Sequence, residues 1–253
     1  MDEFKMSKRD LVLRKPMMNA AGTLGFAPDF HAPIAWDDFG AFVTNPVSLR
    51  PRTVTAKPAL IEYPGGFLLH TGLPNPGLSA TLKKCVRRWG DAALPIIVHL
   101  MGDRPEETQQ MVRSLESIDN VMAIELGFSP SLAEELWSLT LKTCRGELPL
   151  IFCLPPEQVL SLGPRLIEEG AAAISLAAPR GALAASAGKV IEGRLFGPSL
   201  FPRSLEIVHS AVRLGLPVIG AGGVYSEENA QAMIAAGALA VQMDSVLWRG
   251  INN

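Results

Sequence analysis

Leu216-Pro-Val-Ile-Gly-Ala-Gly-Gly-Val-Tyr-Ser-Glu-Glu-Asn229 holds a short apolar run, a glycine turn and the start of a helix in direct succession. An apolar run that is bounded by turn residues and followed by helical spacing is typical of a βα unit in a parallel sheet. The pattern recurs along the chain, and the eight candidate strands are Pro16–Ala21, Ala41–Thr44, Pro95–Leu100, Met122–Leu126, Leu148–Leu154, Ala172–Ala177, Pro217–Ala221 and Ala238–Met243. Eight continuously apolar strands favour a closed barrel over an open doubly wound sheet. The sequence therefore predicts an α/β fold, a TIM (β/α)8 barrel.

Helical spacing occurs between these runs, and several of the segments open with Ser or Pro, as helix starts often do. The expected helices are Leu78–Trp89, Glu106–Leu115, Ser131–Cys144, Pro156–Glu168, Ser204–Leu214 and Ser226–Ala235.

Both ends of the chain depart from the regular barrel pattern. Phe4–Leu13 alternates as an N-terminal β-hairpin would. Only about ten residues follow the eighth strand, so we expect a truncated C-terminal end without the usual final helix. Val246, Leu247 and Trp248 are then expected to be exposed, and apolar surface of this kind favours burial against another subunit. The sequence thus predicts a homo-oligomer or a hetero-complex.

The composition is that of a folded protein with small-molecule or protein partners. The 253 residues are 48% hydrophobic and 19% charged, and no linker-like segment divides them, so we expect a single domain over residues 1–253. The net charge of −2 and the isoelectric point near 6.1 offer no basic surface for nucleic acid.

Neither a membrane segment nor a metal site is expected. No apolar run approaches the roughly 18 residues of a membrane helix, and the charged N-terminus does not resemble a signal peptide, which favours a cytoplasmic protein. The cysteines and histidines show no metal-ligand spacing; they are Cys85, Cys144, Cys153, His31, His70, His99 and His209.

Binding groups of such barrels lie at the carboxyl ends of the strands. The stretch Tyr63–Leu78 is rich in Gly and Pro, surrounds Asn75 and shows neither helical nor strand period, so we expect a binding loop there. A surface Ω-loop without a role is the alternative. Gly222 and Gly223 precede a helix start and are expected to hold a phosphate, or else to serve only a tight turn.

Several motifs along the chain resemble those of one enzyme family. The motifs are Met17–Phe26, Tyr63–Leu78, Gly197–Pro202, Leu216–Val224 and Ala236–Ala238, and they span most of residues 10 to 247 in the same order. In this respect the chain resembles the class 1 dihydroorotate dehydrogenases, FMN-dependent oxidoreductases of pyrimidine biosynthesis.

The resemblance implies an FMN at the top of the barrel that receives a hydride from dihydroorotate, while a Cys or Ser removes a proton. It implies substrate contact by Asn75 and leaves Ser129 as a weak candidate for the base. The cofactor-binding positions that it implies are Ala21, Gly22, Thr44, Asn45, Cys153, Gly197, Gly222, Gly223 and Ser245.

The chain departs from the family at its charged and amide positions. Asn45 and Cys153 stand where the family has two lysines, and Gly127 and the pair Ala177-Ala178 stand where it has substrate-holding amides. Asp244 and Ser245 stand where the family has Gly-Thr, whose backbone helps to hold the FMN phosphate. The Asp244 carboxylate is expected to repel a phosphate unless it points away or pairs with a cation such as Arg249 or Arg180. Ordinary dihydroorotate oxidation is therefore expected to be weak or absent.

Three functions remain open on these residues. The first is an FMN oxidoreductase acting on dihydroorotate or a changed substrate. The second is a catalytically inactive barrel that serves as a partner subunit or binds a small-molecule ligand, and the third is an enzyme of other chemistry with a phosphate-bearing ligand. Lys57, Lys189 and Arg180 are the loop cations that we consider as replacements for the lost lysines; the alternative is that they are solvated, as such side chains mostly are.

Overall fold

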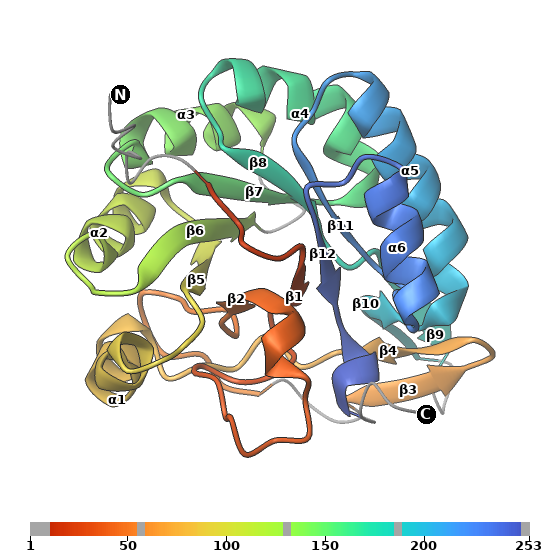
Figure 1. Cartoon of the computed structure of the whole chain (residues 1–253), viewed down its shortest axis with the longest axis horizontal. Coiled ribbons are helices and arrows are strands. Elements are labelled where there is room, and N and C mark those ends of the chain that lie inside the picture. Colours follow the sequence, from red (N-terminus) through yellow and green to blue (C-terminus); the bar gives the residue numbers. More distant parts are fainter. Residues whose placement is uncertain (1–10, 55–58, 129–132, 185–188, 249–253) are drawn as a thin grey trace.

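A computed structural model describes residues 11–54, 59–128, 133–184 and 189–248. Eight parallel strands close into a barrel in the order β1-β12-β11-β8-β7-β6-β5-β2 (Figure 1). Their bounds are β1 Met17–Asn19, β2 Phe39–Val43, β5 Ile96–Gly102, β6 Val121–Phe128, β7 Leu150–Leu154, β8 Ala173–Leu176, β11 Val218–Ala221 and β12 Ala240–Met243. Each predicted apolar run overlaps one of these strands, so the predicted (β/α)8 barrel is confirmed.

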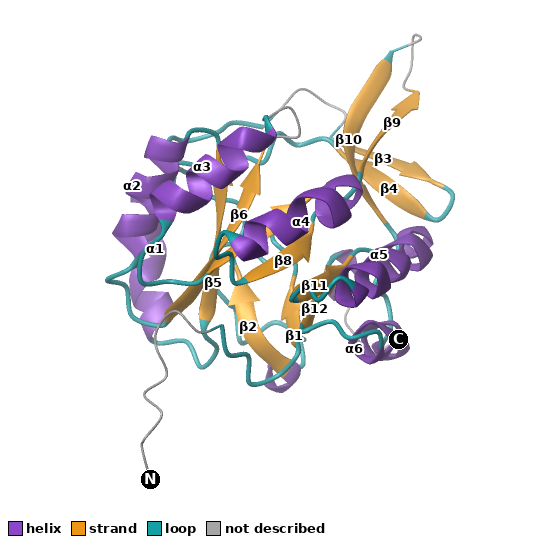
Figure 2. Cartoon of the chain, turned by 90° about the horizontal axis from the view of Figure 1, so that it is seen from above, coloured by secondary structure: helices purple, strands orange, loops and turns teal. Residues whose placement is uncertain are grey.

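Helices cover the outside of the barrel (Figures 1 and 2). The α-helices are α1 Leu78–Gly90, α2 Pro105–Leu115, α3 Glu134–Cys144, α4 Val159–Glu168, α5 Phe201–Arg213 and α6 Glu227–Ala235. Short 3-10 helices are η1 Trp36–Asp38, η2 Pro156–Gln158, η4 Pro198–Leu200 and η5 Ser245–Trp248. Trp89 of α1 and Trp137 of α3 are fully buried in the layer between the helices and the barrel. Their burial helps to hold α1 and α3 against the barrel.

The interior of the barrel is apolar toward the amino ends of the strands and polar toward their carboxyl ends. A separate cluster of buried residues fills the apolar part: Met18, Ala41, Val43, Ile97, Ala123, Ile151, Ala173, Ile219 and Ala240. Side chains along a strand alternate between its two faces. Two residues beyond Ile97 and Ala123, on the same inward face, the strands β5 and β6 therefore place His99 and Glu125.

A second, antiparallel sheet covers part of the barrel mouth. It has the order β3-β4-β10-β9, with β3 Leu60–Tyr63, β4 Gly66–Leu69, β9 Arg180–Ala184 and β10 Val190–Phe196. The first two strands lie in the connection from β2 to α1 and the others in that from β8 to α5, so the sheet stands at the carboxyl ends of the barrel strands (Figure 2).

This sheet corrects the expectation that the whole of Tyr63–Leu78 is a loop. Tyr63 ends β3, and Gly66–Leu69 forms β4 after a turn in which Gly65 has a φ of +89°. Four-residue strands with glycine at their ends show too little alternation for the strand pattern to be read from the sequence.

The ends of the chain differ in part from expectation. The predicted hairpin over Phe4–Leu13 lies mostly outside the described residues, and residues 11–13 form no strand. Val246 and Leu247 were expected to be exposed, but η5 folds them back so that they are buried, at 7% and 4% exposure. Trp248 alone of the three is exposed, at 51%, although its indole N–H donates to the Thr23 carbonyl at 2.8 Å.

None of the helices in the described segments is long and apolar enough to span a bilayer.

Candidate functional site

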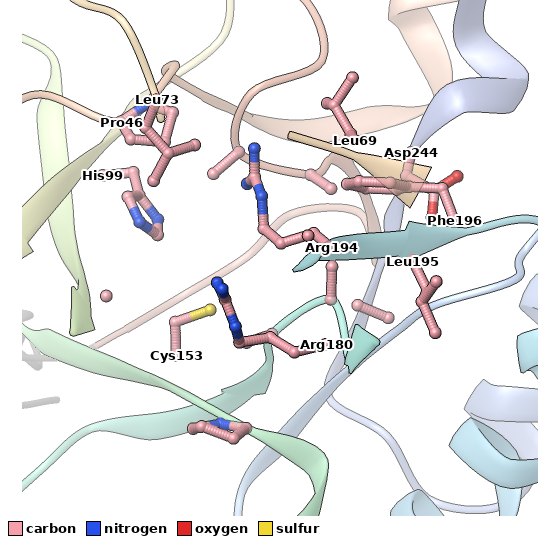
Figure 3. A pocket seen from close by; sticks show the side chains of 18 of the residues that line it. Pro46, Leu69, Leu73, His99, Cys153, Arg180, Arg194, Leu195, Phe196 and Asp244 are labelled. Carbon is pink, nitrogen blue, oxygen red and sulfur yellow. The ribbon is translucent and has the colours of Figure 1, made fainter. Parts of the chain in front are cut away.

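A cavity of about 580 Å³ opens at the carboxyl ends of the barrel strands, beneath the second sheet. Barrel residues form its floor, and Leu69, Arg194 and Phe196 of the second sheet form one wall (Figure 3). Its volume lies within the range of small-molecule sites, and its wall is mostly apolar with a few charged groups. The structure thus places a ligand-sized space where the barrel fold usually carries its chemistry.

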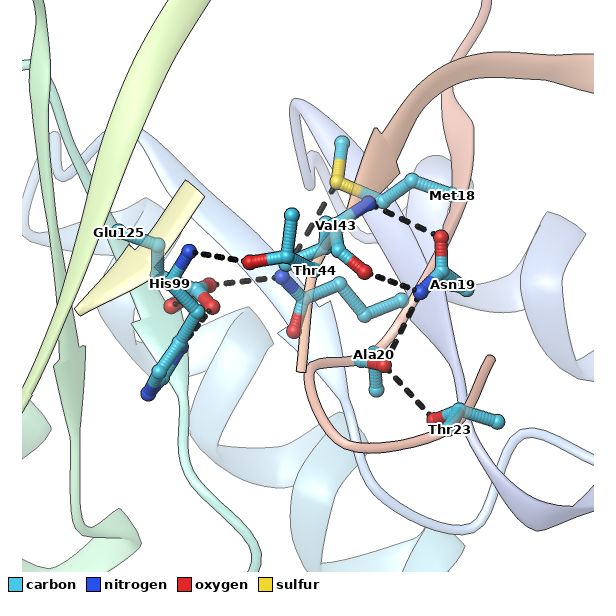
Figure 4. Close-up of polar contacts among 10 residues, drawn as sticks. Met18, Asn19, Ala20, Thr23, Val43, Thr44, His99 and Glu125 are labelled. Atoms are coloured by element: carbon cyan, nitrogen blue, oxygen red, sulfur yellow. Dashed lines mark hydrogen bonds and ion pairs between the residues drawn. The ribbon is translucent and has the colours of Figure 1, made fainter. Parts of the chain in front are cut away.

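A buried carboxylate organises the floor of this cavity. Glu125 is fully buried, and its Oε2 lies 2.6 Å from Nδ1 of His99. Its Oε1 accepts hydrogen bonds from the Ser175 hydroxyl at 2.6 Å and from the Gln242 amide at 2.7 Å. Thr44 completes the arrangement, since its hydroxyl oxygen accepts from the His99 backbone N–H at 3.1 Å (Figure 4).

These contacts keep Glu125 ionised in spite of its burial. Burial by itself would raise the pKa of the carboxyl group, but the hydrogen bond from His99, the charge of that ring and the bonds from Ser175 and Gln242 outweigh it and lower the pKa. An ionised carboxylate can only accept, so Nδ1 of His99 carries a hydrogen and Nε2 is left on the cavity side. His99 is thereby oriented as a proton-transferring or hydrogen-bonding group of the cavity.

Cys153 lies beside this group as a neutral thiol. Burial and the nearby charge of Glu125 raise its pKa, while the Ser175 hydroxyl and the Arg194 guanidinium oppose this only in part. A thiol in this state is neither a nucleophile nor a cation at neutral pH. Cys153 therefore does not supply the positive charge of the lysine whose place it takes.

The expected site residues are not all brought to the cavity. Ala21, Cys153 and Gly222 line it, and Ser129 lies outside the described residues. The others stand apart from the lining: Gly22, Thr44, Asn45, Asn75, Gly197, Gly223 and Ser245. Of the cations considered as replacements, Arg180 lines the cavity, Lys189 is exposed elsewhere, and Lys57 lies outside the described residues.

Asn75 holds its own loop together. Its side-chain oxygen accepts from Ser48 N–H at 3.2 Å, the Ser48 hydroxyl at 3.0 Å and Gly77 N–H at 3.0 Å. Its amide nitrogen donates to the Leu73 carbonyl at 3.1 Å. Asn45 is used similarly, since its oxygen accepts from Gly25 N–H at 3.0 Å. Both amides contribute to loop structure, and substrate contact by Asn75 stays a prediction.

The glycine turn after β11 packs tightly against α5. A Cβ on Gly222 would lie 2.6 Å from the Ser204 hydroxyl oxygen, and one on Gly223 would overlap the backbone of Phe201. Both glycines also have positive φ, +95° and +74°. The turn needs glycine for close packing whether or not a phosphate binds there.

Asp244 accepts hydrogen bonds from this turn and from the residue that follows it in the chain. Its Oδ1 accepts from Ser245 N–H at 2.5 Å and from the Ser245 hydroxyl at 3.0 Å, and its carboxylate also accepts from Gly223 N–H. The side chain is 5% exposed, and burial raises its pKa against the opposing effect of these bonds. Within the described part of the chain, no ion pair joins Asp244 to a cation.

These residues do not fit the phosphate of an FMN. A carboxylate and a phosphate about 4 Å apart repel each other by about 4 kcal/mol per unit charge at an effective dielectric of about 20. Two of the backbone donors at this end, the N–H groups of Ser245 and Gly223, are also already bonded to Asp244. The phosphate end of this barrel is therefore closed by a side chain of the protein itself.

Three important residues of the cavity, His99, Glu125 and Arg194, were not selected from the sequence. The sequence rule examined residues that follow each apolar run, whereas His99 and Glu125 lie within two of the runs. Their position on the inward face of a buried strand could have identified both residues, because titratable groups are rarely buried without a partner. Arg194 gave no such signal, since it belongs to the sheet that the sequence did not reveal.

Gly127 makes room for His99, which leads to a first prediction. A Cβ at residue 127 would lie 2.5 Å from Nε2 of His99, so Gly127→Ala is expected to displace the ring and lower the free energy of unfolding by about 1–3 kcal/mol. Gly90→Ala is the matched control, because nothing lies within 4 Å of its added Cβ. Urea unfolding measures both; equal stability of the two variants would show that His99 is not confined by Gly127.

Comparison with known proteins agrees with the barrel fold. The family model described as dihydroorotate dehydrogenase matches residues 5–136, slightly more than half of the chain. A dihydroorotate dehydrogenase B (NAD(+)) catalytic subunit of Pelobacter propionicus is 32% identical over 92% of this chain and 84% of its own length. The proteins of that name from Trichlorobacter lovleyi and Thermoanaerobacter pseudethanolicus are 31% and 30% identical, covering 92% and 91% of this chain and 84% and 83% of their own lengths. With its eight-stranded parallel barrel and these relatives, the chain belongs to the dihydroorotate dehydrogenase family.

Proposed function

We propose that this member of the family does not carry out ordinary dihydroorotate oxidation with FMN, and that its barrel mouth binds a small organic molecule instead. The family is generally FMN-dependent. The observation that carries the proposal is the Asp244 carboxylate, which accepts from Ser245 and Gly223 at the place where a phosphate would be held.

Two further features of the cavity support this proposal. The family's lysine positions are held by Asn45, whose amide is used in its loop, and by Cys153, whose thiol stays neutral. The ligand-sized cavity is nevertheless kept, with His99 held on its floor by Glu125. A barrel that had become purely structural would have no need of a buried carboxylate to orient a cavity-facing imidazole, since such pairs add little net stability.

The absorbance of the purified protein tests the proposal. We expect no flavin bands in the isolated protein and, after addition of FMN, a rate of anaerobic flavin bleaching by dihydroorotate at least about a thousandfold below that of an active family member, because several charged and amide groups are lost together. A yellow preparation that dihydroorotate bleaches rapidly would contradict the proposal.

We further propose that the chain assembles with another subunit, as a homo-oligomer or a hetero-complex. The relatives are named as catalytic subunits, and Trp248 presents a half-exposed indole beside Phe67 of the second sheet. Light scattering of the purified chain, alone and with candidate partners, measures this. A monodisperse monomer that binds no partner subunit would contradict it.

A further inference from the structure

We propose that Arg180 and Arg194 form a binding site for the carboxylate group of a small, phosphate-free organic acid in the barrel mouth. The site belongs to the second sheet and involves none of the positions that the family resemblance assigns to substrate. The proposal does not depend on whether the chain retains any dihydroorotate oxidation.

The two arginines are brought together by the register of the second sheet. Arg180 of β9 and Arg194 of β10 are directly opposed partners in this antiparallel pair. Both guanidinium groups project into the cavity, which His99 and Cys153 also line (Figure 3). Their spacing is thus set by backbone hydrogen bonds, which makes the pair a preorganised feature of the cavity.

Neither guanidinium has an anionic partner among the described residues. No ion pair or hydrogen bond to a carboxylate involves Arg180 or Arg194 in the part of the chain that the structure describes, and Arg194 instead lies over the Phe196 ring, 5.7 Å from its centre. Like charges on opposed strand positions are destabilising. Burial, with a smaller effect of the Arg180 charge, lowers the pKa of Arg194 to about 10. An anion between the two side chains would relieve this repulsion.

The rest of the cavity favours an organic acid over an inorganic anion. The planar guanidinium forks match the two oxygens of a carboxylate. Beyond them, apolar side chains such as Pro46, Leu73 and Phe196 offer surface to an uncharged body, and His99 offers a hydrogen-bonding group on the floor. The phosphate end is closed by Asp244, so a ligand with a phosphate group has no second place to bind.

Calorimetric titration of the purified full chain tests the site with a matched pair of probes. Orotate and uracil share one ring, and orotate alone carries a carboxylate; benzoate and succinate extend the test to other organic acids. We expect at least one of the three acids to bind the unaltered protein and uracil to bind at least about tenfold more weakly than orotate if orotate is that acid. Arg194→Gln and Arg180→Gln are each expected to weaken binding of the acid about tenfold or more.

Arg203→Gln is the control, because this exposed arginine of α5 pairs with Glu206 and lies outside the cavity. Circular dichroism checks that each variant is folded, and Arg180→Gln removes an exposed side chain whose loss leaves the barrel core intact. The proposal is overturned if none of the acids binds at millimolar concentration, if folded Arg180→Gln and Arg194→Gln bind as the unaltered protein does, or if inorganic phosphate or sulfate binds as tightly as the acids. Because heat of binding is measured without flavin, the result is independent of the absorbance test above.

Discussion

Glu125→Gln is expected to lower the free energy of unfolding by about 3–5 kcal/mol, because it removes the one acceptor that three buried donors share. Both carboxylate oxygens are in use, Oε2 toward His99 and Oε1 toward Ser175 and Gln242. A glutamine amide keeps the shape but replaces one acceptor oxygen by a donor NH2 group. In the tautomer that Glu125 imposes, the Nδ1–H of His99 would face this NH2 group, so His99 has to change its tautomer or lose its partner.

Urea unfolding at neutral pH measures this loss, and Glu62→Gln is the matched control. Glu62 is an exposed residue of β3, so the same chemical change there is expected to alter stability by less than about 0.5 kcal/mol. A loss below about 1 kcal/mol for Glu125→Gln would show that Glu125 does not hold the floor of the cavity together.

The difference in unfolding free energy between the unaltered protein and Glu125→Gln is expected to depend on pH, because folding shifts the pKa of Glu125. The pKa of Glu125 is lower in the folded protein than its ordinary value of 4.5. Its stabilisation is therefore fully present above pH 4.5 and is lost as the pH falls through the folded pKa. The stability gap between the unaltered protein and Glu125→Gln should therefore shrink as the pH falls below 4.5. The titratable groups around Glu125 are His99 and Cys153, and the Cys153 thiol stays neutral throughout this range because its pKa is raised.

Asp244→Gly is expected to give the barrel a preference for phosphate that the natural chain lacks. The change removes the carboxylate and frees the N–H groups of Gly223 and Ser245. It also restores the residue that the family resemblance places there. Removing a repulsion of about 4 kcal/mol per unit charge corresponds to roughly two to three orders of magnitude in affinity after screening by salt.

FMN and riboflavin measure this preference, because they differ only by the phosphate. In the natural chain we expect FMN to bind no more tightly than riboflavin, by quenching of flavin fluorescence. In Asp244→Gly we expect FMN to be favoured about a hundredfold or more, and inorganic phosphate to raise the melting temperature of the variant. Asp103→Gly, which removes another carboxylate at the cavity rim, is the control. A strong preference of the unaltered protein for FMN over riboflavin would contradict the assignment of Asp244.

Local sequence pattern was sufficient for the barrel strands but not for the sheet above them. Each apolar run became a barrel strand because a buried strand needs apolar residues on both faces, which the sequence displays directly. The second sheet joins Gly66–Leu69 with Val190–Phe196, segments far apart in the chain. Short, half-exposed strands of this kind are stabilised by pairing across the fold, and neither segment carries that information alone.

In the candidate site, too, some features could be predicted from the sequence and others only from the folded structure. Motif resemblance was enough to indicate the family and to identify Asn45, Cys153 and Asp244 as departures from it, because residue identity at matched positions is a property of the sequence. Whether Asp244 points away from the phosphate end or fills it depended on hydrogen bonds to Gly223 and Ser245, which only the folded chain has.

The sequence by itself determined that this chain forms a (β/α)8 barrel of the dihydroorotate dehydrogenase family with altered residues at its mouth. Only the tertiary structure decided what replaces the lost groups: a Glu125-held His99 on the floor and an opposed pair, Arg180 and Arg194, in the wall. The physical reason is distance along the chain. His99 and Glu125 come from adjacent strands in register, and the arginines from another sheet, so their charges act together only after backbone pairing has placed them around one cavity.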